Sequence, residues 1–413
     1  MTALATRQTT AFPGFVFFLV NLLALTYVVP FLSLMLFFCV TALLIKGKQL
    51  FEQRELGGYW AFSVLILLAV LFYYHSSATM IGTASPLAWY LEKASPGLLE
   101  YLRAPKVLSS IGVSYCFLRA VYALLQPRLS FWDFARYYLF FPTFFSGPVI
   151  GVEEYLSQTP AFRRSNIEPA IARIIIGAIK VVGSQLLIGF IPLSSEVAMI
   201  EQIQSTSVAG AWFYAFSAGV WLFLNFSGFS DICIGLAKLF NISVPENFNN
   251  PFAARDITDF WRRWHMTLAA WLRTCIYTPV TKLLGGRYGH QHALLHIIPP
   301  ILTMLVCGLW HGISLAFVFW GLMHGFGLVV HQGYKSTVGG WWPTRFRESN
   351  AYKLSAWLMT HAYVGATWVF FFPSPTPSLK LSLLYFTRMF GVVNYEVDMA
   401  ITNLHQYYHS FTF

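Results

Sequence analysis

Charged residues are scarce in this sequence. Asp, Glu, Lys and Arg together make up 11% of the 413 residues, whereas hydrophobic residues make up 56%. Soluble domains carry about 25% charged residues, so this chain has too few to cover a surface that faces water. Its mean hydropathy is +0.57. The deficit excludes an ordinary soluble fold and indicates a surface that faces lipid.

Long stretches contain no charged residue at all, and a helix needs about 20 apolar residues to cross a bilayer. Helices are expected because open strands leave backbone groups unsatisfied in lipid. A β-barrel would instead show alternating segments of about ten residues. The sequence therefore predicts an all-α, polytopic transmembrane helical bundle of about 10–12 spans. The candidate ranges are Phe12–Val29, Phe31–Ile45, Tyr59–Ile81, Val107–Gln126, Tyr137–Ile150, Ala170–Pro192, Val208–Phe226, Ala293–Trp310, Ile313–His331, Leu354–Phe372 and Leu381–Val393.

Several common motifs are missing as well. The sequence has no GxSxG nucleophile elbow, no Walker A loop and no GxGxxG pattern. Its histidines lack an HExxH or similar carboxylate–histidine spacing, so we expect no metal site and no tightly bound cofactor. The cysteines show no CxxC pair, and we interpret them as small core residues. They are Cys39, Cys116, Cys233, Cys275 and Cys307.

Positive charge exceeds negative charge, with a formal net charge of +10. In membrane proteins Lys and Arg collect in cytoplasmic loops, so we expect this excess to set orientation and not to bind nucleic acid. The uncharged run Tyr288–Tyr334 is long enough for two crossings. Its flanks, Ala254–Arg287 and Lys335–Lys353, are both basic, which predicts that both lie in the cytoplasm. The apolar run Ala11–Ile45 is too long for a cleavable signal peptide.

Two polar segments interrupt the apolar pattern. Pro245–Pro251 (PENFNNP) is rich in turn-forming residues and is bracketed by prolines. In Phe260–Tyr277, Trp264, Leu268 and Trp271 recur at helical spacing. This pattern predicts one amphipathic helix at the membrane interface, with arginines on its polar face.

Histidines concentrate in the uncharged run, and His311 stands at its midpoint. Ionisable residues at membrane depth are costly, so each is a functional candidate. Gly308 and Gly312 flank His311, where they permit close approach and a helix break. A histidine there suits a general base acting on a hydroxyl. For His324, packing and function both stay open, and the remaining histidines of the run lie near its ends: His290, His292, His296 and His331.

Further motifs occur along the chain in a characteristic order. They are FFPTFFSGP (Phe140–Pro148), NFSGFSDICIGLAKLF (Asn225–Phe240), PENFNNPF (Pro245–Phe252), FWRRWHMTLAAWLR (Phe260–Arg273), GLWHG (Gly308–Gly312) and FWGLMHG (Phe319–Gly325). In these motifs the chain resembles the membrane-bound O-acyltransferase (MBOAT) family, in particular its bacterial alginate O-acetyltransferase-like branch.

The resemblance implies a single membrane domain over residues 1–413, with a motif core at 225–331. Re-entrant or interfacial helices would surround a central funnel. It also implies that His311 and His265 are catalytic. We further expect Arg262, Arg263 and Arg273 to receive an anionic donor, and Trp310 and Asn247 to contact substrate.

The leading hypothesis is a membrane-bound O-acyltransferase. It would move an acetyl group from a cytoplasmic thioester, acetyl-CoA or an acyl carrier protein, to hydroxyls of an extracytoplasmic polysaccharide or cell-wall polymer. Expected partners are membrane lipids and either an extracytoplasmic SGNH-type acetyltransferase or a small acyl carrier protein. The expected location is the bacterial cytoplasmic (inner) membrane.

Two alternatives stay open. One is a D-alanyl transferase of teichoic acid modification that uses an acyl carrier protein. The other is a different class, a transporter or flippase of a lipid-linked glycan, because polar residues and broken helices inside spans also occur in transporters.

Overall fold

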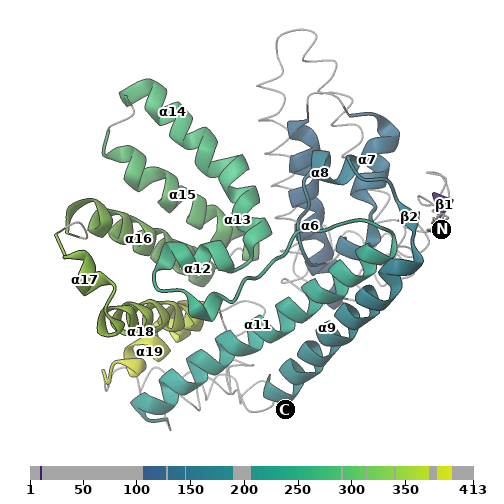
Figure 1. Cartoon of the computed structure of the whole chain (residues 1–413). Coiled ribbons are helices and arrows are strands. Elements are labelled where there is room, and N and C mark those ends of the chain that lie inside the picture. Colours follow the sequence, from purple (N-terminus) through teal and green to yellow (C-terminus); the bar gives the residue numbers. More distant parts are fainter. Residues whose placement is uncertain are drawn as a thin grey trace, which may run out of the picture. The chain divides into compact units, whose positions relative to one another are not determined.

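The computed structural model describes residues 10–11, 106–126, 129–144, 146–188, 206–289, 292–312, 314–338, 341–371 and 379–392. This part of the chain is almost entirely helical (Figure 1), which confirms the all-α prediction. One short antiparallel pair joins β1 (Thr10–Ala11) to β2 (Ala161–Phe162). The predicted spans Phe12–Val29, Phe31–Ile45 and Tyr59–Ile81 lie outside the described residues.

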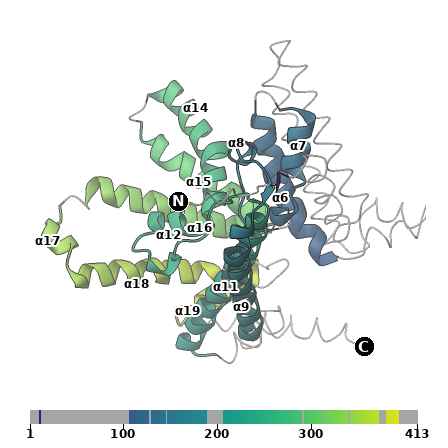
Figure 2. The same cartoon turned by 45° about the vertical axis from the view of Figure 1, so that its right-hand side comes forward.

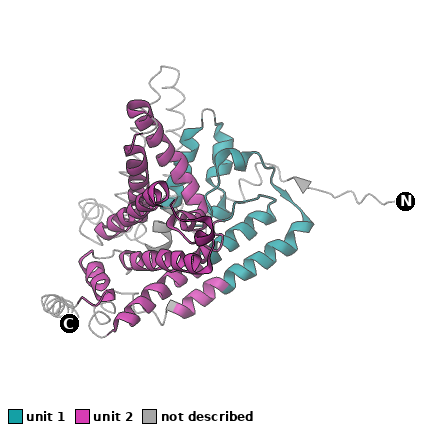
Figure 3. Cartoon of the chain, turned by 60° about the vertical axis from the view of Figure 1, so that its left-hand side comes forward, with its two compact units in different colours: residues 1–179, 227–246 teal, residues 180–226, 247–413 magenta. Residues whose placement is uncertain are grey.

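The chain divides into two compact units (Figure 3). Unit 1 comprises residues 1–179 and 227–246, and unit 2 comprises residues 180–226 and 247–413. Unit 1 holds α6 (Lys106–Leu125), α7 (Phe131–Tyr138), η1 (Phe141–Thr143), α8 (Val152–Leu156), η2 (Arg164–Asn166), most of α9 (Ile167–Ile188) and the end of α11 (Val208–Leu239).

A buried arginine shapes the segment after α7 in unit 1. Arg119 of α6 is 1% exposed and donates to the carbonyls of Tyr138 and Phe140 at 3.0 and 3.3 Å. The Tyr138 carbonyl therefore needs no helical donor, and Pro142, four residues later, has no N–H to give. The predicted span Tyr137–Ile150 is consequently wrong: α7 ends at Tyr138, and a short η1 and an irregular loop follow.

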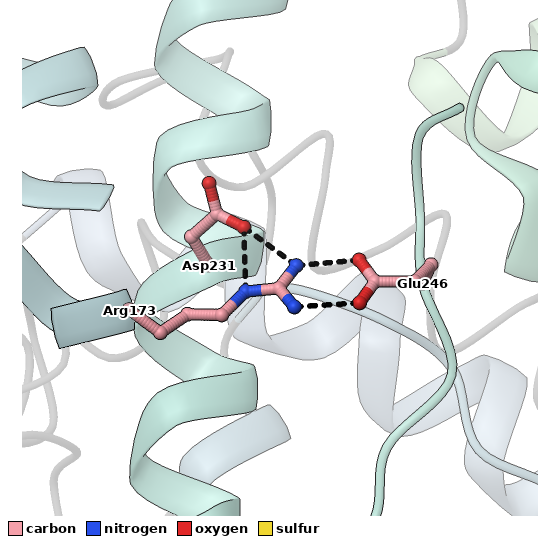
Figure 4. A network of polar contacts seen from close by, with 3 residues as sticks. All are labelled: Arg173, Asp231 and Glu246. Carbon is pink, nitrogen blue, oxygen red and sulfur yellow. Dashed lines mark hydrogen bonds and ion pairs between the residues drawn. The ribbon is translucent and has the colours of Figure 1, made fainter. Parts of the chain in front are cut away.

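Helices α9 and α11 approach closely within unit 1. A β-carbon at Gly177 would lie 2.5 Å from the carbonyl oxygen of Gly228. Near this contact, Arg173 of α9 donates to Asp231 of α11 at 2.8 and 2.9 Å and to Glu246 at 2.6 Å (Figure 4). Because Asp231 is paired in this way, α11 continues through it to Leu239 and does not end at Phe226 as predicted.

Unit 2 holds the remaining elements. They are the end of α9, the first part of α11, η4 (Pro251–Ala253), α12 (Ile257–Arg263), α13 (Met266–Leu272), the π-helical turn η5 (Arg273–Tyr277), α14 (Thr278–Tyr288), α15 (Leu294–His311), α16 (Leu315–Thr337), α17 (Thr344–Arg347), α18 (Asn350–Thr367), η6 (Trp368–Phe370) and α19 (Leu379–Met389).

Four helices of the described part are long and apolar enough to cross a membrane: Arg164–Leu187, Val208–Leu239, Leu294–His311 and Leu315–Thr337. They confirm four of the predicted spans, and the chain is a multi-pass membrane protein. The predicted spans Val107–Gln126, Leu354–Phe372 and Leu381–Val393 coincide with the helices α6, α18 and α19, which are not among these four.

Glycines bring α15 and α16 together as an antiparallel hairpin (Figures 1 and 2). A β-carbon at Gly308 or Gly321 would overlap a main-chain carbonyl of the opposite helix, that of Phe317 or Met304. Small residues of this kind let membrane helices pack with their backbones in contact. The hairpin therefore fixes the position of His311 at its tip.

The segment predicted as one helix, Phe260–Tyr277, is broken. Helix α12 ends at Arg263, and His265 adopts left-handed backbone angles, with φ 42° and ψ 53°, before α13 begins. Further on, the Thr278 N–H bonds the Arg273 carbonyl five residues back, which makes η5 a π-helical turn. Pro279 favours this turn because proline has no N–H to donate to the carbonyl four residues earlier, as a regular α-helix would require.

Candidate active site

His311 is the last residue of α15, at the break that its glycines permit. Gly312 is extended, with φ 164° and ψ 161°, and α16 starts at Leu315. Aromatic rings border the imidazole, with centroid distances of 4.7 Å to Trp310, 4.8 Å to Phe371 and 5.4 Å to Trp320. The half-buried imidazole of His311 is therefore bordered by aromatic rings.

His265 lies in the break between α12 and α13 and is 2% exposed. Its Nδ1 is 2.9 Å from Oδ1 of Asn247, whereas its Nε2 is buried without a hydrogen-bond partner among the described residues. Burial lowers the pKa of His265 well below its ordinary value, and the charge of nearby His311 lowers it further. His265 is thus a neutral base in this environment.

Trp310 connects the two histidines. Its ring centroid is 6.0 Å from that of His265 and 4.7 Å from that of His311. The structure therefore gathers four of the residues singled out in the sequence, His311, Trp310, His265 and Asn247, into one cluster. Their roles toward substrate stay predictions.

His324 is buried and has partners on both ring nitrogens. Trp261 Nε1 donates to its Nδ1 at 3.3 Å, and its Nε2 is 2.9 Å from Thr367 Oγ1. The Thr367 hydroxyl donates to the Val364 carbonyl, so it accepts from His324. Both ring nitrogens of His324 thus have partners within the described residues, which favours packing over function at this position.

Edge-to-face contacts through Trp320 and Trp261 connect His311 with a cavity of unit 2. Trp261 lines the cavity, and its ring centroid is 5.9 Å from that of Trp320, which is 5.4 Å from that of His311. Trp320 is 2% exposed, and its Nε1 has no hydrogen-bond partner within the described ranges. Two indole rings in contact thus link the cavity lining with His311.

The cavity has a volume of about 400 Å³ and is framed by α12, α13, η5, α15 and α16. Three cationic side chains line it: Arg262, Arg273 and Lys335. Arg273 opens the π-helical turn η5, a feature often found at functional sites. Such a lining suits an anionic ligand, above all a phosphate.

Arg263 does not line this cavity. Its Nε donates to Asp259 Oδ1 at 2.9 Å, and its Nη1 donates to the Asn249 carbonyl at 3.3 Å. The structure thus separates Arg263 from Arg262 and Arg273, and its expected contact with a donor stays a prediction.

Sequence reasoning missed several residues of this site. Lys335 was counted only as a charge that sets orientation, and nothing in the pattern paired Trp261 with Trp320 or placed Phe371 against His311. Thr267, whose Oγ1 donates to Asn247 Oδ1 at 2.9 Å, was also missed. In the described part of the chain, no three His, Cys, Asp or Glu residues lie close enough to hold a metal ion.

Comparison with known proteins places this geometry in a family. Residues 14–369 match the sequence profile of the membrane-bound O-acyltransferase family. A peptidoglycan O-acetyltransferase of Helicobacter pylori is 34% identical over 266 residues, 60% of this chain and 46% of that protein. A teichoic acid D-alanyltransferase of Streptococcus thermophilus is 30% identical over 247 residues, 55% of this chain and 58% of that protein.

A probable alginate O-acetylase of Pseudomonas aeruginosa is 31% identical over 271 residues, 64% of this chain and 47% of that protein. The chain thus spans about half the length of the curated relatives it matches. The family profile covers most of the sequence. The chain belongs to the membrane-bound O-acyltransferase family.

Proposed function

We propose that this protein transfers an acyl group, an acetyl group as the first candidate, from a cytoplasmic thioester to hydroxyls of an extracytoplasmic cell-envelope polymer. The observation that carries the proposal is the placement of His311. On one side His311 contacts Trp310, which in turn contacts His265. On the other side it contacts Trp320, which contacts Trp261 in the lining of the cationic cavity. A base is thereby held between a second histidine and a site for an anionic donor.

In the proposed reaction, His311 accepts the hydrogen of the acceptor hydroxyl while the hydroxyl oxygen attacks the thioester carbonyl. The carbon–sulfur bond then breaks, and the imidazolium hydrogen passes to the leaving sulfur. His311 returns to its neutral form, the acyl group becomes an ester, and a free thiol is released. Hydroxyl and thioester must approach within about 3–3.5 Å for this step.

Trp320 is the candidate donor to the thioester carbonyl oxygen as negative charge develops there. Its indole N–H is buried beside His311 and has no partner among the described residues. A donor aimed at a developing oxyanion contributes about 10²–10³ in rate where water is excluded.

The cavity suits the phosphate-bearing end of the donor. Coenzyme A and carrier-protein thioesters share a phosphopantetheine arm, and guanidinium groups bind phosphate through paired hydrogen bonds. Arg262, Arg273 and Lys335 supply the positive charge. The flanks of the α15–α16 hairpin are basic, which supports a donor site on the cytoplasmic side of a bacterial cytoplasmic membrane.

Transfer of D-alanine to a teichoic acid is the second candidate. The specific observation in its favour is coverage: the match spans 58% of the D-alanyltransferase but 46% of the peptidoglycan O-acetyltransferase. The two candidates require different partners. Acetyl transfer suits a relay to an extracytoplasmic SGNH-type acetyltransferase, whereas D-alanyl transfer requires a small acyl carrier protein.

Mass analysis of cell-envelope glycans tests the proposal. Cells that lack the gene should lose one ester modification, and its mass identifies acetyl or D-alanyl. The wild-type gene should restore the ester, and a His311→Ala gene should not. An unchanged set of envelope esters in the deletion strain would refute the proposed function.

A further inference from the structure

Asn247 lies in the loop before η4 and is 1% exposed. Its two oxygen atoms accept three hydrogen bonds from the segment around His265. The backbone oxygen accepts from the Met266 N–H at 2.9 Å. Oδ1 accepts from Thr267 Oγ1 and faces His265 Nδ1, each at 2.9 Å. One buried side chain thus organises the break between α12 and α13.

These contacts determine which nitrogen of His265 carries the hydrogen. An amide oxygen has no hydrogen to donate, so the hydrogen between Oδ1 and Nδ1 belongs to the imidazole. A neutral imidazole carries only one ring hydrogen, and Nε2 therefore presents a lone pair. Asn247 in this way specifies the Nδ1–H tautomer.

The lone pair on Nε2 has no hydrogen-bond partner in the part of the chain that the structure describes. His324 shows the contrast, because Trp261 and Thr367 occupy both of its nitrogens. Native proteins rarely leave a buried acceptor without a partner, and each exception calls for an explanation such as a catalytic role. For His265, substrate would supply the missing donor.

The backbone at this point is strained. His265 has φ 42° and ψ 53°, a left-handed conformation that is uncommon for a residue with a side chain. Two backbone hydrogen bonds hold it, from Met266 N–H to Asn247 O and from Asn249 N–H to Arg263 O, both at 2.9 Å. Strain of this kind gathers at active sites, where the surrounding contacts maintain it.

We propose that Asn247 is a positioning residue: it holds His265 in the Nδ1–H tautomer so that Nε2 accepts a hydrogen bond from the acceptor substrate beside His311. This inference rests on the proposed acyl transfer and assigns the second histidine its part in it. His311 still takes the hydroxyl hydrogen, while His265 orients the acceptor.

The surroundings of His265 keep it neutral. Phe226 from α11 and Trp310 from α15 pack against its ring, with centroids 4.6 and 6.0 Å away. Asn247 and Thr267 add uncharged polar contacts, and the charge that acts on it from the described residues is that of His311. An aspartate at position 247 would raise the pKa of His265, because a carboxylate beside Nδ1–H stabilises the imidazolium.

The experiment compares Asn247→Asp and Asn247→Ala in the purified full chain. The ¹⁵N shifts of the His265 imidazole report its tautomer, and thioester consumption with an acceptor supplied reports the rate as a function of pH. Asn247→Asp should retain the Nδ1–H tautomer and raise the pKa of His265, which the same ¹⁵N shifts follow through a pH titration. Asn247→Ala should lower kcat and leave the donor KM unchanged.

Asn249→Ala is the matched control. Asn249 is exposed, and it bonds Arg263 through its backbone N–H, which alanine keeps. Its tautomer, rate and pH profile should equal those of the wild type. An Nε2–H tautomer in the wild type, or a His265 pKa that Asn247→Asp does not raise, would overturn the inference. Full activity of His311→Ala would instead refute the proposed function, and the ¹⁵N shifts would still decide whether Asn247 sets the tautomer.

Discussion

Gly308 of α15 lies directly against the main-chain carbonyl of Phe317 in α16, so closely that a β-carbon at position 308 would overlap this oxygen. The Phe317 ring in turn lies 6.1 Å from that of His311, centroid to centroid. The approach of the two helices therefore determines where the candidate base stands.

Gly308→Ala is expected to lower the melting temperature of the purified protein, because overpacking a close contact costs about 1–3 kcal/mol. It should also lower kcat, since the end of α15 moves with His311. Gly333→Ala in α16 is the matched control. A β-carbon there meets nothing within 4 Å, and alanine favours a helix by about 1 kcal/mol. Equal losses of melting temperature and kcat in Gly308→Ala and Gly333→Ala would contradict the close approach of the two helices at Gly308.

The cationic cavity predicts a defect in donor binding. Arg262→Gln and Arg273→Gln should each raise the donor KM about 10- to 100-fold, as expected when a charge-assisted hydrogen bond of roughly 1.5–3 kcal/mol is lost. Arg287→Gln, in α14 outside the cavity lining, should leave the donor KM unchanged. Arg263→Gln decides whether that side chain belongs to the donor site. An unaltered donor KM in both cavity variants would mean that the donor does not bind in this cavity.

The ion pair between Arg173 and Asp231 predicts energetic coupling between α9 and α11. Asp231 is 10% exposed at its side chain, so a double-mutant cycle with Arg173→Gln and Asp231→Asn should give about 0.5–3 kcal/mol of coupling. The pair Arg136–Asp133, with side chains 31% and 37% exposed, is the control, and exposed pairs contribute about 0.2–1 kcal/mol. Denaturation in detergent measures both. If the coupling energy of Arg173–Asp231 is no larger than that of Arg136–Asp133, the ion pair does not stabilise the packing of α9 against α11.

The hairpin predicts the topology of its two ends. Cysteines introduced at the exposed Gly286 in α14 and at Trp341 after α16 should both react with a membrane-impermeant thiol reagent from the cytoplasmic side only. The reason is that two crossings, α15 and α16, separate them. Labelling from opposite sides would show that one arm of the hairpin does not cross the membrane.

Much of the fold follows from the distribution of charge. The uncharged runs predicted α9, α11, α15 and α16 because a span must be apolar along its length. The end of α11 was missed because Asp231 resembles a boundary until Arg173 is seen to pair with it. The break at His265 was missed for a similar reason: periodicity reports local spacing, whereas Asn247 holds this turn from an earlier loop.

The site was predictable in part. Glycines on both sides marked His311 as a helix break, and the family resemblance pointed to His265. The contacts that give these histidines different roles join residues distant in sequence, such as Trp261 with Trp320 and Asn247 with His265. No pattern in a single sequence encodes those pairs.

The release of thiol from a donor thioester by purified protein in detergent tests the central claim most directly, since detergent removes the sealed compartments that a transporter needs. The wild type should release thiol when an acceptor or partner is supplied, with a rate that falls in acid because an imidazolium cannot accept a proton. His311→Ala should remain soluble and folded but lose about 10²–10⁴ in rate, the usual contribution of a general base. Near-normal thiol release by His311→Ala, or vesicles that move an unmodified glycan while no thioester is consumed, would contradict this account.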